Sequence, residues 1–264
     1  MSNWPITPAS RFEYIGATTG GGTALTGGSA NVKGSYATIG TTGFAWSQFL
    51  LSFVNTGSNS RFRVDIAINT GGSDQIIVED LFVDLSISQS QPVVVLIPVA
   101  VPAGATVKGR FQAELSGRTL GVILCGYAQG FMGAPGAARL RSFTDWTNTN
   151  PTNSVAQNGQ SWTAWTQIMA TTPERAVALY FSNSEAADNS RTGSNYLVEI
   201  AKGASGSEVA IGAFVGRQLT AGWGGIIGAI PCDLPAGERL SFRCQCDTVS
   251  IADSISVACN GLVP

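Results

Sequence analysis

Hydrophobic and polar residues alternate with a period of two along several segments of the chain. In the clearest segment the apolar positions are Phe62, Val64, Ile66 and Ile68, separated by Arg63, Asp65 and Ala67. Residues 107–114 and 240–247 follow the same pattern. Such alternation predicts half-buried antiparallel strands, whose successive side chains point to opposite faces of a sheet. We find no window of a dozen residues with the helical period of 3.6, so the predicted fold class is all-β.

The second feature of the chain is an internal repeat. Ile97-Pro98 and Val101-Pro102-Ala103-Gly104, followed by Arg110, Gln112 and Glu114, recur at a constant offset as Ile230-Pro231 and Leu234-Pro235-Ala236-Gly237, followed by Arg243, Gln245 and Asp247. Upstream, Val64-Asp65-Ile66-Ala67 and Gly72-Ser73-Asp74 recur as Val198-Glu199-Ile200-Ala201 and Gly206-Ser207-Glu208, with an offset one residue larger. A single deletion in a loop produces such a change of offset. The repeat predicts two copies of one module.

The repeat and the turn signals divide the chain into four parts. Residues 1–33 form a Gly/Thr-rich N-terminal arm, which is either flexible or held by neighbouring subunits. The first antiparallel β-sandwich occupies residues 34–129, a Gly/Ala/Pro-rich linker 130–139, and the second sandwich 140–264. We therefore predict two tandem, jelly-roll-like sandwiches. Each Pro-Ala-Gly tripeptide marks a turn before a strand, because proline removes a ladder donor and glycine tolerates a positive φ.

The composition and charge of the chain limit the kinds of partner that we expect it to bind. Charged residues make up only 12% of the chain, and the formal net charge is −2. Without a cluster of Lys and Arg the chain lacks the positive surface that binds phosphate backbones, so we predict no nucleic-acid partner. The longest apolar run, residues 93–101, is interrupted by Pro98 and is too short to span a membrane. The first residues show no secretory signal, so we expect synthesis in a cytoplasm.

The sequence offers few groups for catalysis or metal binding. Histidine is absent, which excludes the triads that use an imidazole base. The five cysteines, Cys125, Cys232, Cys244, Cys246 and Cys259, occupy apolar positions of the repeat. We interpret them as buried thiols; a disulfide or a metal bound by Cys244 and Cys246 is the alternative. We predict no catalytic residue, no metal and no cofactor.

Paired carboxylates are the one enzymatic alternative, because glycoside hydrolysis needs only two acids. The candidates are Asp65, Glu79, Asp80, Asp84, Glu185 and Asp188. However, Asp and Glu exchange between the copies at Asp65/Glu199, Asp74/Glu208 and Glu114/Asp247. A catalytic acid rarely tolerates a shift of one methylene, whereas a cross-strand partner of Arg110 or Arg243 does. The exchange favours a structural role for these acids.

Tryptophans near the start of the second module suggest a different function. Trp162 and Trp165, together with Trp146 and Trp223, offer ring faces that stack on sugars. At a spacing of three within a strand, the indoles of Trp162 and Trp165 would face opposite sides, so we expect at least one of them in the core. Packing and glycan contact remain alternatives for this pair.

The order of the motifs resembles β-sandwich modules of tailed-bacteriophage structural proteins, of the tail, fibre and head-decoration type. The shared order is Gly34-Ser35-Tyr36 or Gln160-Ser161-Trp162, then Val-Asp/Glu-Ile-Ala, Gly-Ser-Asp/Glu, Ile-Pro, Pro-Ala-Gly and Arg-x-Gln. The resemblance implies a non-enzymatic virion protein that forms homo-oligomers, often trimers, and attaches to other virion proteins at the head, neck or tail. The resemblance assigns no functional residue to this sequence.

Three hypotheses follow. The leading one is a structural virion protein, and the low charge of the chain suits it to large subunit contacts, for which the edge strands of a sandwich are templates. The second is a receptor- or glycan-binding module of a fibre, which would bind host surface glycan. The third is an enzyme that degrades polysaccharide with paired acids.

Overall fold

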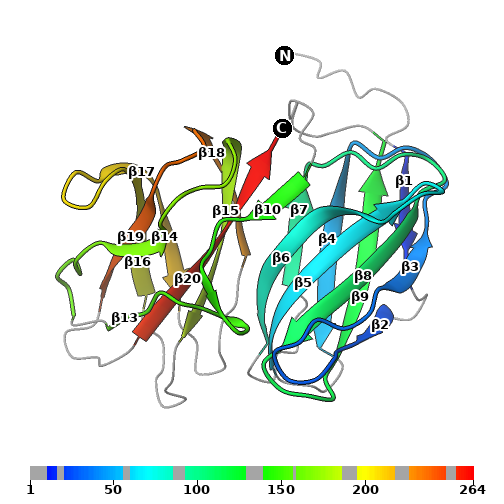
Figure 1. Ribbon diagram of the computed structural model, residues 1–264, viewed down its shortest axis with the longest axis horizontal. Helices are drawn as coiled ribbons and strands as arrows, with labels where there is room; N and C mark the ends of the chain where they lie inside the picture. The colour runs from blue at the N-terminus through cyan, green and yellow to red at the C-terminus, as the bar shows by residue number, and fades with distance from the viewer. Residues whose placement is uncertain are drawn as a thin grey trace, which may run out of the picture.

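Each half of the chain forms a β-sandwich, and the two sandwiches lie side by side (Figure 1). The computed structural model describes residues 11–16, 21–55, 60–85, 93–128, 139–156, 159–185, 195–217, 226–247 and 254–264. These residues form strands and turns but no helix, which confirms the predicted all-β class. Accordingly, none of them belongs to a helix long and apolar enough to cross a membrane.

The first sandwich consists of two facing sheets. One sheet has the order β1-β9-β4-β7, with β2 also paired to β9; the other has the order β3-β8-β5-β6. The strands are β1 (Phe12–Ile15), β2 (Thr23–Thr26), β3 (Ala37–Thr41), β4 (Gln48–Asn55), β5 (Ser60–Asn69), β6 (Gln75–Leu85), β7 (Val93–Ile97), β8 (Thr106–Ala113) and β9 (Thr119–Tyr127).

The second sandwich repeats this plan. Its sheets have the orders β10-β20-β15-β18, with β13 paired to β20, and β14-β19-β16-β17, and a small hairpin, β11-β12, is added. The strands are β10 (Arg139–Ser142), β11 (Trp146–Thr147), β12 (Asn150–Pro151), β13 (Val155–Ala156), β14 (Thr166–Met169), β15 (Ala176–Glu185), β16 (Asn195–Lys202), β17 (Val209–Arg217), β18 (Ile226–Leu234), β19 (Leu240–Cys246) and β20 (Ser254–Val263).

The two halves agree strand by strand once the hairpin is set aside. β1 corresponds to β10 and β2 to β13, and β3 to β9 correspond in order to β14 to β20. The register agrees as well, because Asp65 lies opposite Arg110 and Glu199 lies opposite Arg243. The internal repeat read from the sequence is therefore a repeat of topology.

The Gly/Thr-rich leader contains part of the repeat, contrary to the prediction that residues 1–33 form a separate arm. β1 and β2 pair one after the other with β9, and the side chains of Ile15 and Leu25 are buried in the first core. β9 is long enough to hold both short strands on one edge while β4 occupies the other. Residues 1–10 and 17–20 lie outside the described residues.

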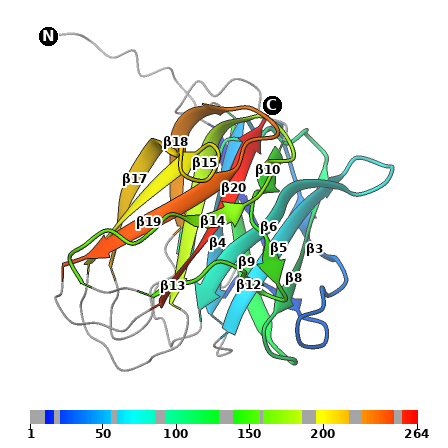
Figure 2. The same cartoon turned by 60° about the vertical axis from the view of Figure 1, so that its left-hand side comes forward.

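The sandwiches are joined through β10. This strand pairs antiparallel with β20 and, where Leu140 lies opposite Val78, parallel with β6. One nine-stranded sheet thus runs through both halves, as the adjacent positions of β20, β10 and β6 in Figures 1 and 2 show. Of the predicted linker, residues 130–138 lie outside the described residues, and Arg139 already belongs to β10.

Two hydrophobic cores fill the sandwiches. The first contains the predicted alternating residues, including Phe62, Val64, Phe111 and Val107, and the second contains their counterparts of β16 and β19. Four residues of the second half, Leu140, Ala178, Tyr180 and Leu262, nevertheless belong to the first core. The second sandwich therefore closes part of the first, and the two cores are not independent.

Both Pro-Ala-Gly tripeptides form the predicted turns. Gly104 and Gly237 have φ values of 73° and 88°, in the region that favours glycine. A buried threonine fixes each turn, because Thr42 Oγ1 donates to Pro102 O at 2.7 Å and Thr172 Oγ1 donates to Pro235 O at 2.9 Å. Each hydroxyl also accepts the backbone N–H of the residue that follows the turn glycine, at 3.0 Å in both copies.

Candidate functional site

The recurring acidic and basic positions form ion pairs between neighbouring strands on the outer face of each sandwich. Arg110 Nε lies 2.8 Å from Asp65 Oδ2, and Arg243 Nε lies 2.6 Å from Glu199 Oε2. The longer glutamate makes the same contact as the aspartate. This confirms the interpretation of these carboxylates as cross-strand partners of arginine.

An aromatic ring covers the guanidinium in both copies. The Cζ atom of Arg110 lies 4.4 Å from the ring centroid of Tyr36, and that of Arg243 lies 4.7 Å from Trp162 and 4.4 Å from Trp165. These are cation–π distances. Each sandwich therefore carries a carboxylate, an arginine and an aromatic ring in the same order, which we call the paired unit.

The prediction that Trp162 or Trp165 packs in the core was wrong. Residues 159–165 form no strand, so a spacing of three does not send the two indoles to opposite faces. Both rings contact the one guanidinium of Arg243. Trp162 is 37% exposed and Trp165 is half-buried.

In the first sandwich the paired unit is part of a buried cluster of charges. Asp65 is fully buried, and Lys33 Nζ lies 2.7 Å from its Oδ2 and 2.8 Å from Asp80 Oδ1. Arg63 pairs with the other oxygen of Asp80, and the Asp80 N–H donates to Asp65 Oδ1 at 2.9 Å. Burial, followed by the charge of Asp65, raises the pKa of Tyr36. Two candidate acids thus meet here, but cations neutralise both of them.

The hairpin β11-β12 of the second half covers this cluster. Arg63 stacks on the Trp146 ring at 4.4 Å and donates through Nη1 to Asn148 O at 2.7 Å. Next to them, Gln112 Nε2 donates to Thr149 Oγ1 at 3.1 Å. The hairpin therefore covers part of this cluster, in which the carboxylates of Asp65 and Asp80 are largely buried.

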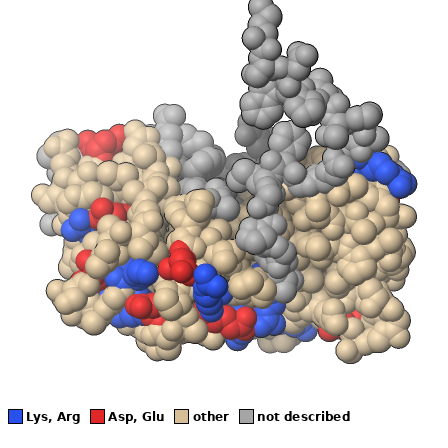
Figure 3. All heavy atoms as spheres, turned by 90° about the horizontal axis from the view of Figure 1, so that it is seen from above, with Lys and Arg blue, Asp and Glu red and all other residues tan. Residues whose placement is uncertain are grey.

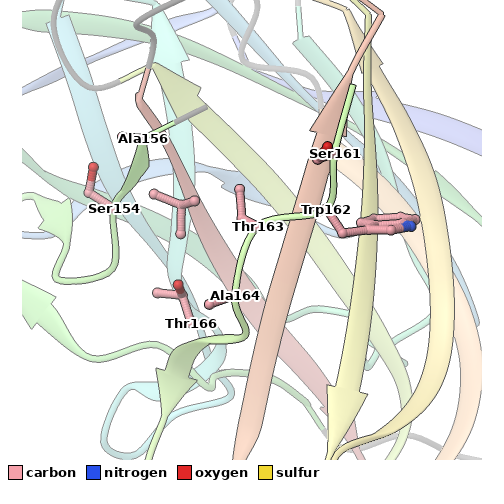
Figure 4. A pocket seen from close by; sticks show the side chains of 8 residues that line it. Ser154, Ala156, Ser161, Trp162, Thr163, Ala164 and Thr166 are labelled. Atoms are coloured by element: carbon pink, nitrogen blue, oxygen red, sulfur yellow. The ribbon is translucent and has the colours of Figure 1, made fainter. Parts of the chain in front are cut away.

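The second paired unit is open. Beside it lies a hollow of about 500 Å³, lined largely by small side chains and hydroxyl groups from residues 154–156, 161–164 and 166 (Figure 4). The side chains of Ser154, Thr163 and Thr166 lie on one side of this segment, whereas the indole of Trp162 points away from them. Trp162 is nevertheless one of the residues that line the hollow, so the paired unit and the hollow adjoin each other at this residue.

The other candidate acids are dispersed. Asp84 Oδ2 lies 3.3 Å from Arg61 Nε, and Glu79 Oε2 lies 3.6 Å from Arg141 Nε. The side chain of Glu185 and the whole of Asp188 lie outside the described residues. In Figure 3 the charged side chains gather mainly along one border of the visible surface, and most of the rest of the visible surface that is not grey carries no charge.

The five cysteines, all of them described, form no disulfide. Cys244, Cys246 and Cys259 are buried in the second core, whereas Cys125 and Cys232 are half-buried, less than the interpretation as core thiols predicted. Burial raises the pKa of Cys232 to about 11 and raises that of Cys259 as well, which disfavours the reactive thiolate. Among the described residues we find no cluster of three or more His, Cys, Asp or Glu suited to a metal ion.

Comparison with known proteins gives distant likenesses only. No protein-family model matches the sequence, and no curated protein matches it. Similar solved structures include PNGF-II (TM-score 0.41, 9% identity, 95% of this chain, 66% of that chain) and the STIV MCP (TM-score 0.35, 8% identity, 96% and 97%). The CBM22-1-CBM22-2 tandem domain of Paenibacillus barcinonensis Xyn10C is similar at a TM-score of 0.26 (10% identity, 96% and 91%). This chain spans just under two thirds of the length of PNGF-II. None of these likenesses assigns a function.

Proposed function

We propose that this chain is a non-enzymatic structural protein of a tailed-phage virion, assembled as a homo-oligomer on the head, neck or tail. The resemblance of its motif order to such modules motivates the proposal. The observation that carries it is that recurring polar positions stabilise the sandwiches themselves.

The contacts of the recurring acids support this role. Besides the two paired units, Glu114 contacts Arg61 at 3.7 Å, and its counterpart Asp247 accepts the backbone N–H of Asn195 at 3.0 Å. Arg61 and Asn195 occupy equivalent places in β5 and β16, next to the strand ends. Positions retained in both copies thus hold neighbouring strands together, as a scaffold requires.

The test is to locate the protein in purified particles. We expect the recombinant chain to sediment as an oligomer, and a specific antibody to label particles at one defined structure in electron micrographs. A monodisperse monomer that is absent from purified particles would contradict the proposal. Release of oligosaccharide from host polysaccharide by the purified chain would contradict its non-enzymatic part.

Glycan binding is the second candidate, and the exposure of Trp162 favours it. A ring that already covers a guanidinium on one face still offers its other face to a sugar. If this function holds, we expect binding on an array of host-surface glycans that is lost in Trp162→Ala. Binding should be retained in Trp146→Ala, because the Trp146 ring belongs to the hairpin β11-β12 and stacks on Arg63. An array without signal for the wild-type chain would remove this candidate.

A further inference from the structure

The contact between the two sandwiches uses a sheet face of the second and a sheet edge of the first. On the face, Tyr180 and Leu262 belong to the first hydrophobic core, and Ser182 hydrogen-bonds to the first sandwich. Tyr180 Oη donates to Leu96 O at 3.1 Å, and Ser182 Oγ donates to Phe82 O at 3.0 Å. Leu140 of β10 completes the face, because it pairs with the edge strand β6 and is fully buried.

The first sandwich has an equivalent face, which carries exposed apolar side chains among the described residues. Since β4 and β9 correspond to β15 and β20, Leu50, Ser52 and Tyr127 take the places of Tyr180, Ser182 and Leu262. Phe12 of β1 lies opposite Tyr127 just as Leu140 of β10 lies opposite Leu262. Phe12 is 63% exposed, whereas its counterpart Leu140 is buried.

The same face carries further exposed apolar side chains. Tyr14 alternates with the buried Ile15 and therefore shares the outer face with Phe12, where it is 61% exposed. Val94 of β7 lies on the same face and is 46% exposed. We call the outer surface of β1, β9, β4 and β7 the open face.

The second sandwich has an edge equivalent to that of β6 in the first, and this edge carries exposed apolar side chains. β17 corresponds to β6 and is the last strand of its sheet, so one of its sides has no partner strand within the described residues. From Val209 to Gly216 this strand contains no charged residue. Val215, the counterpart of the buried Phe82, is 64% exposed, and Val209 is 61% exposed. We call β17 the open edge.

We propose that the open face of one copy binds the open edge of a second copy, so that the contact between the two sandwiches within a chain is repeated between chains. Phe12 then takes the place of Leu140, and Ser52 Oγ donates to the backbone carbonyl of Val215 as Ser182 Oγ donates to Phe82 O. The inference rests on the proposed homo-oligomer and names its interface.

Three features indicate that the partner of these two surfaces is a second copy of the chain. The two open surfaces belong to the same chain and are the repeat counterparts of two surfaces that already fit each other. Both lack charge at their centres, as subunit interfaces do. An unprotected, uncharged edge strand also pairs readily with another chain. Because the contact joins unlike surfaces, it is heterologous, and repetition gives a ring or a filament.

The test combines two charge substitutions. Phe12→Asp disrupts the open face, and Val215→Asp disrupts the open edge; both side chains are exposed, so each variant should fold. We expect sedimentation velocity to find the wild-type chain oligomeric and each variant monomeric. Leu115→Asp, at an apolar residue that is 48% exposed outside both surfaces, should remain oligomeric. Circular dichroism confirms that the strand content is unchanged.

Mixing the two variants distinguishes this interface from any other. Phe12→Asp keeps a working edge and Val215→Asp keeps a working face, so an equimolar mixture should give a dimer of one copy of each and nothing larger. A mixture that stays monomeric, or variants that remain oligomeric alone, would overturn the interface. Those outcomes leave the virion role intact, since that role is tested separately by locating the chain in particles.

Discussion

The paired units of the two sandwiches have the same register but different surroundings. Asp65 is fully buried and is bound by both Arg110 and Lys33, whereas the side chain of Glu199 is 23% exposed and pairs with Arg243. One copy has thus become part of the interior while the other has stayed at the surface. Equivalent positions in a duplicated fold can therefore differ in burial and in the number of their charged partners.

A single extra residue in β6 explains much of the difference. Between the pairs Val64–Leu81 and Ile66–Val78 the register of β5 and β6 shifts, and Asp80 lies in this bulge with a φ of 48°. A bulge re-aims its side chain, and here it brings the Asp80 carboxylate to Lys33 beside Asp65. At the equivalent pairs β16 and β17 run in continuous register, without this bulge.

The largest expected effect on stability distinguishes the carboxylate of Asp65 from that of Glu199. Asp65→Asn removes a fully buried charge, leaves Arg110 without its carboxylate partner and leaves Lys33 with Asp80 alone, so we expect a loss of about 3–5 kcal/mol in the free energy of unfolding. Glu199→Gln at the partly exposed pair should cost less than about 1 kcal/mol. Urea denaturation followed by tryptophan fluorescence measures both. Similar losses in the two variants would show that burial does not distinguish the units.

The threonines that fix the two turns should behave alike. Thr42→Val and Thr172→Val keep the shape of the side chain but remove one donated and one accepted hydrogen bond in a buried place. We expect each to lower the free energy of unfolding by about 2 kcal/mol. Denaturation under identical conditions, with Thr→Ser variants as controls that keep the hydroxyl, tests whether the two turns are equivalent. A loss in one copy alone would contradict the equivalence.

Substitution of the turn glycines should have the next largest effect on the free energy of unfolding. Gly237→Ala forces a side chain into the left-handed region at a cost of about 1 kcal/mol, and Gly237→Val should cost more because a β-branched residue tolerates this region least. No heavy atom outside the adjacent residues lies within 4 Å of a Cβ added at Gly237, so Gly237→Ala measures mainly backbone strain. Gly104 provides the matched position in the first sandwich. Equal melting temperatures for the Ala and Val variants would argue against the turn.

Period-two alternation and the repeat were sufficient to predict strands around residues 62–68, 107–114 and 240–247, the two Pro-Ala-Gly turns, and cross-strand carboxylate partners for Arg110 and Arg243. They could not predict that β1 lies in the sheet, because four residues in a glycine-rich leader are too few to establish a period. The Lys33–Asp65 contact joins residues that no local pattern relates, and the bulge at Asp80 interrupts the very alternation used to find strands. The position of Trp162 was missed because strand geometry was assumed for a segment without a strand.

The smallest expected effect concerns the rings over the two arginines. Tyr36→Leu and Trp162→Leu each remove a cation–π contact, worth about 0.5–1 kcal/mol at such sites. Because Trp165 still covers Arg243, the loss in the second sandwich should be the smaller one. Tyr36→Phe is the control: it keeps the ring over Arg110 and removes a buried hydroxyl that has no partner among the described residues, so it should be neutral or slightly stabilising. Destabilisation by Tyr36→Phe as large as that by Tyr36→Leu would assign the effect to the hydroxyl, and the ring would then not be the feature that the two paired units share.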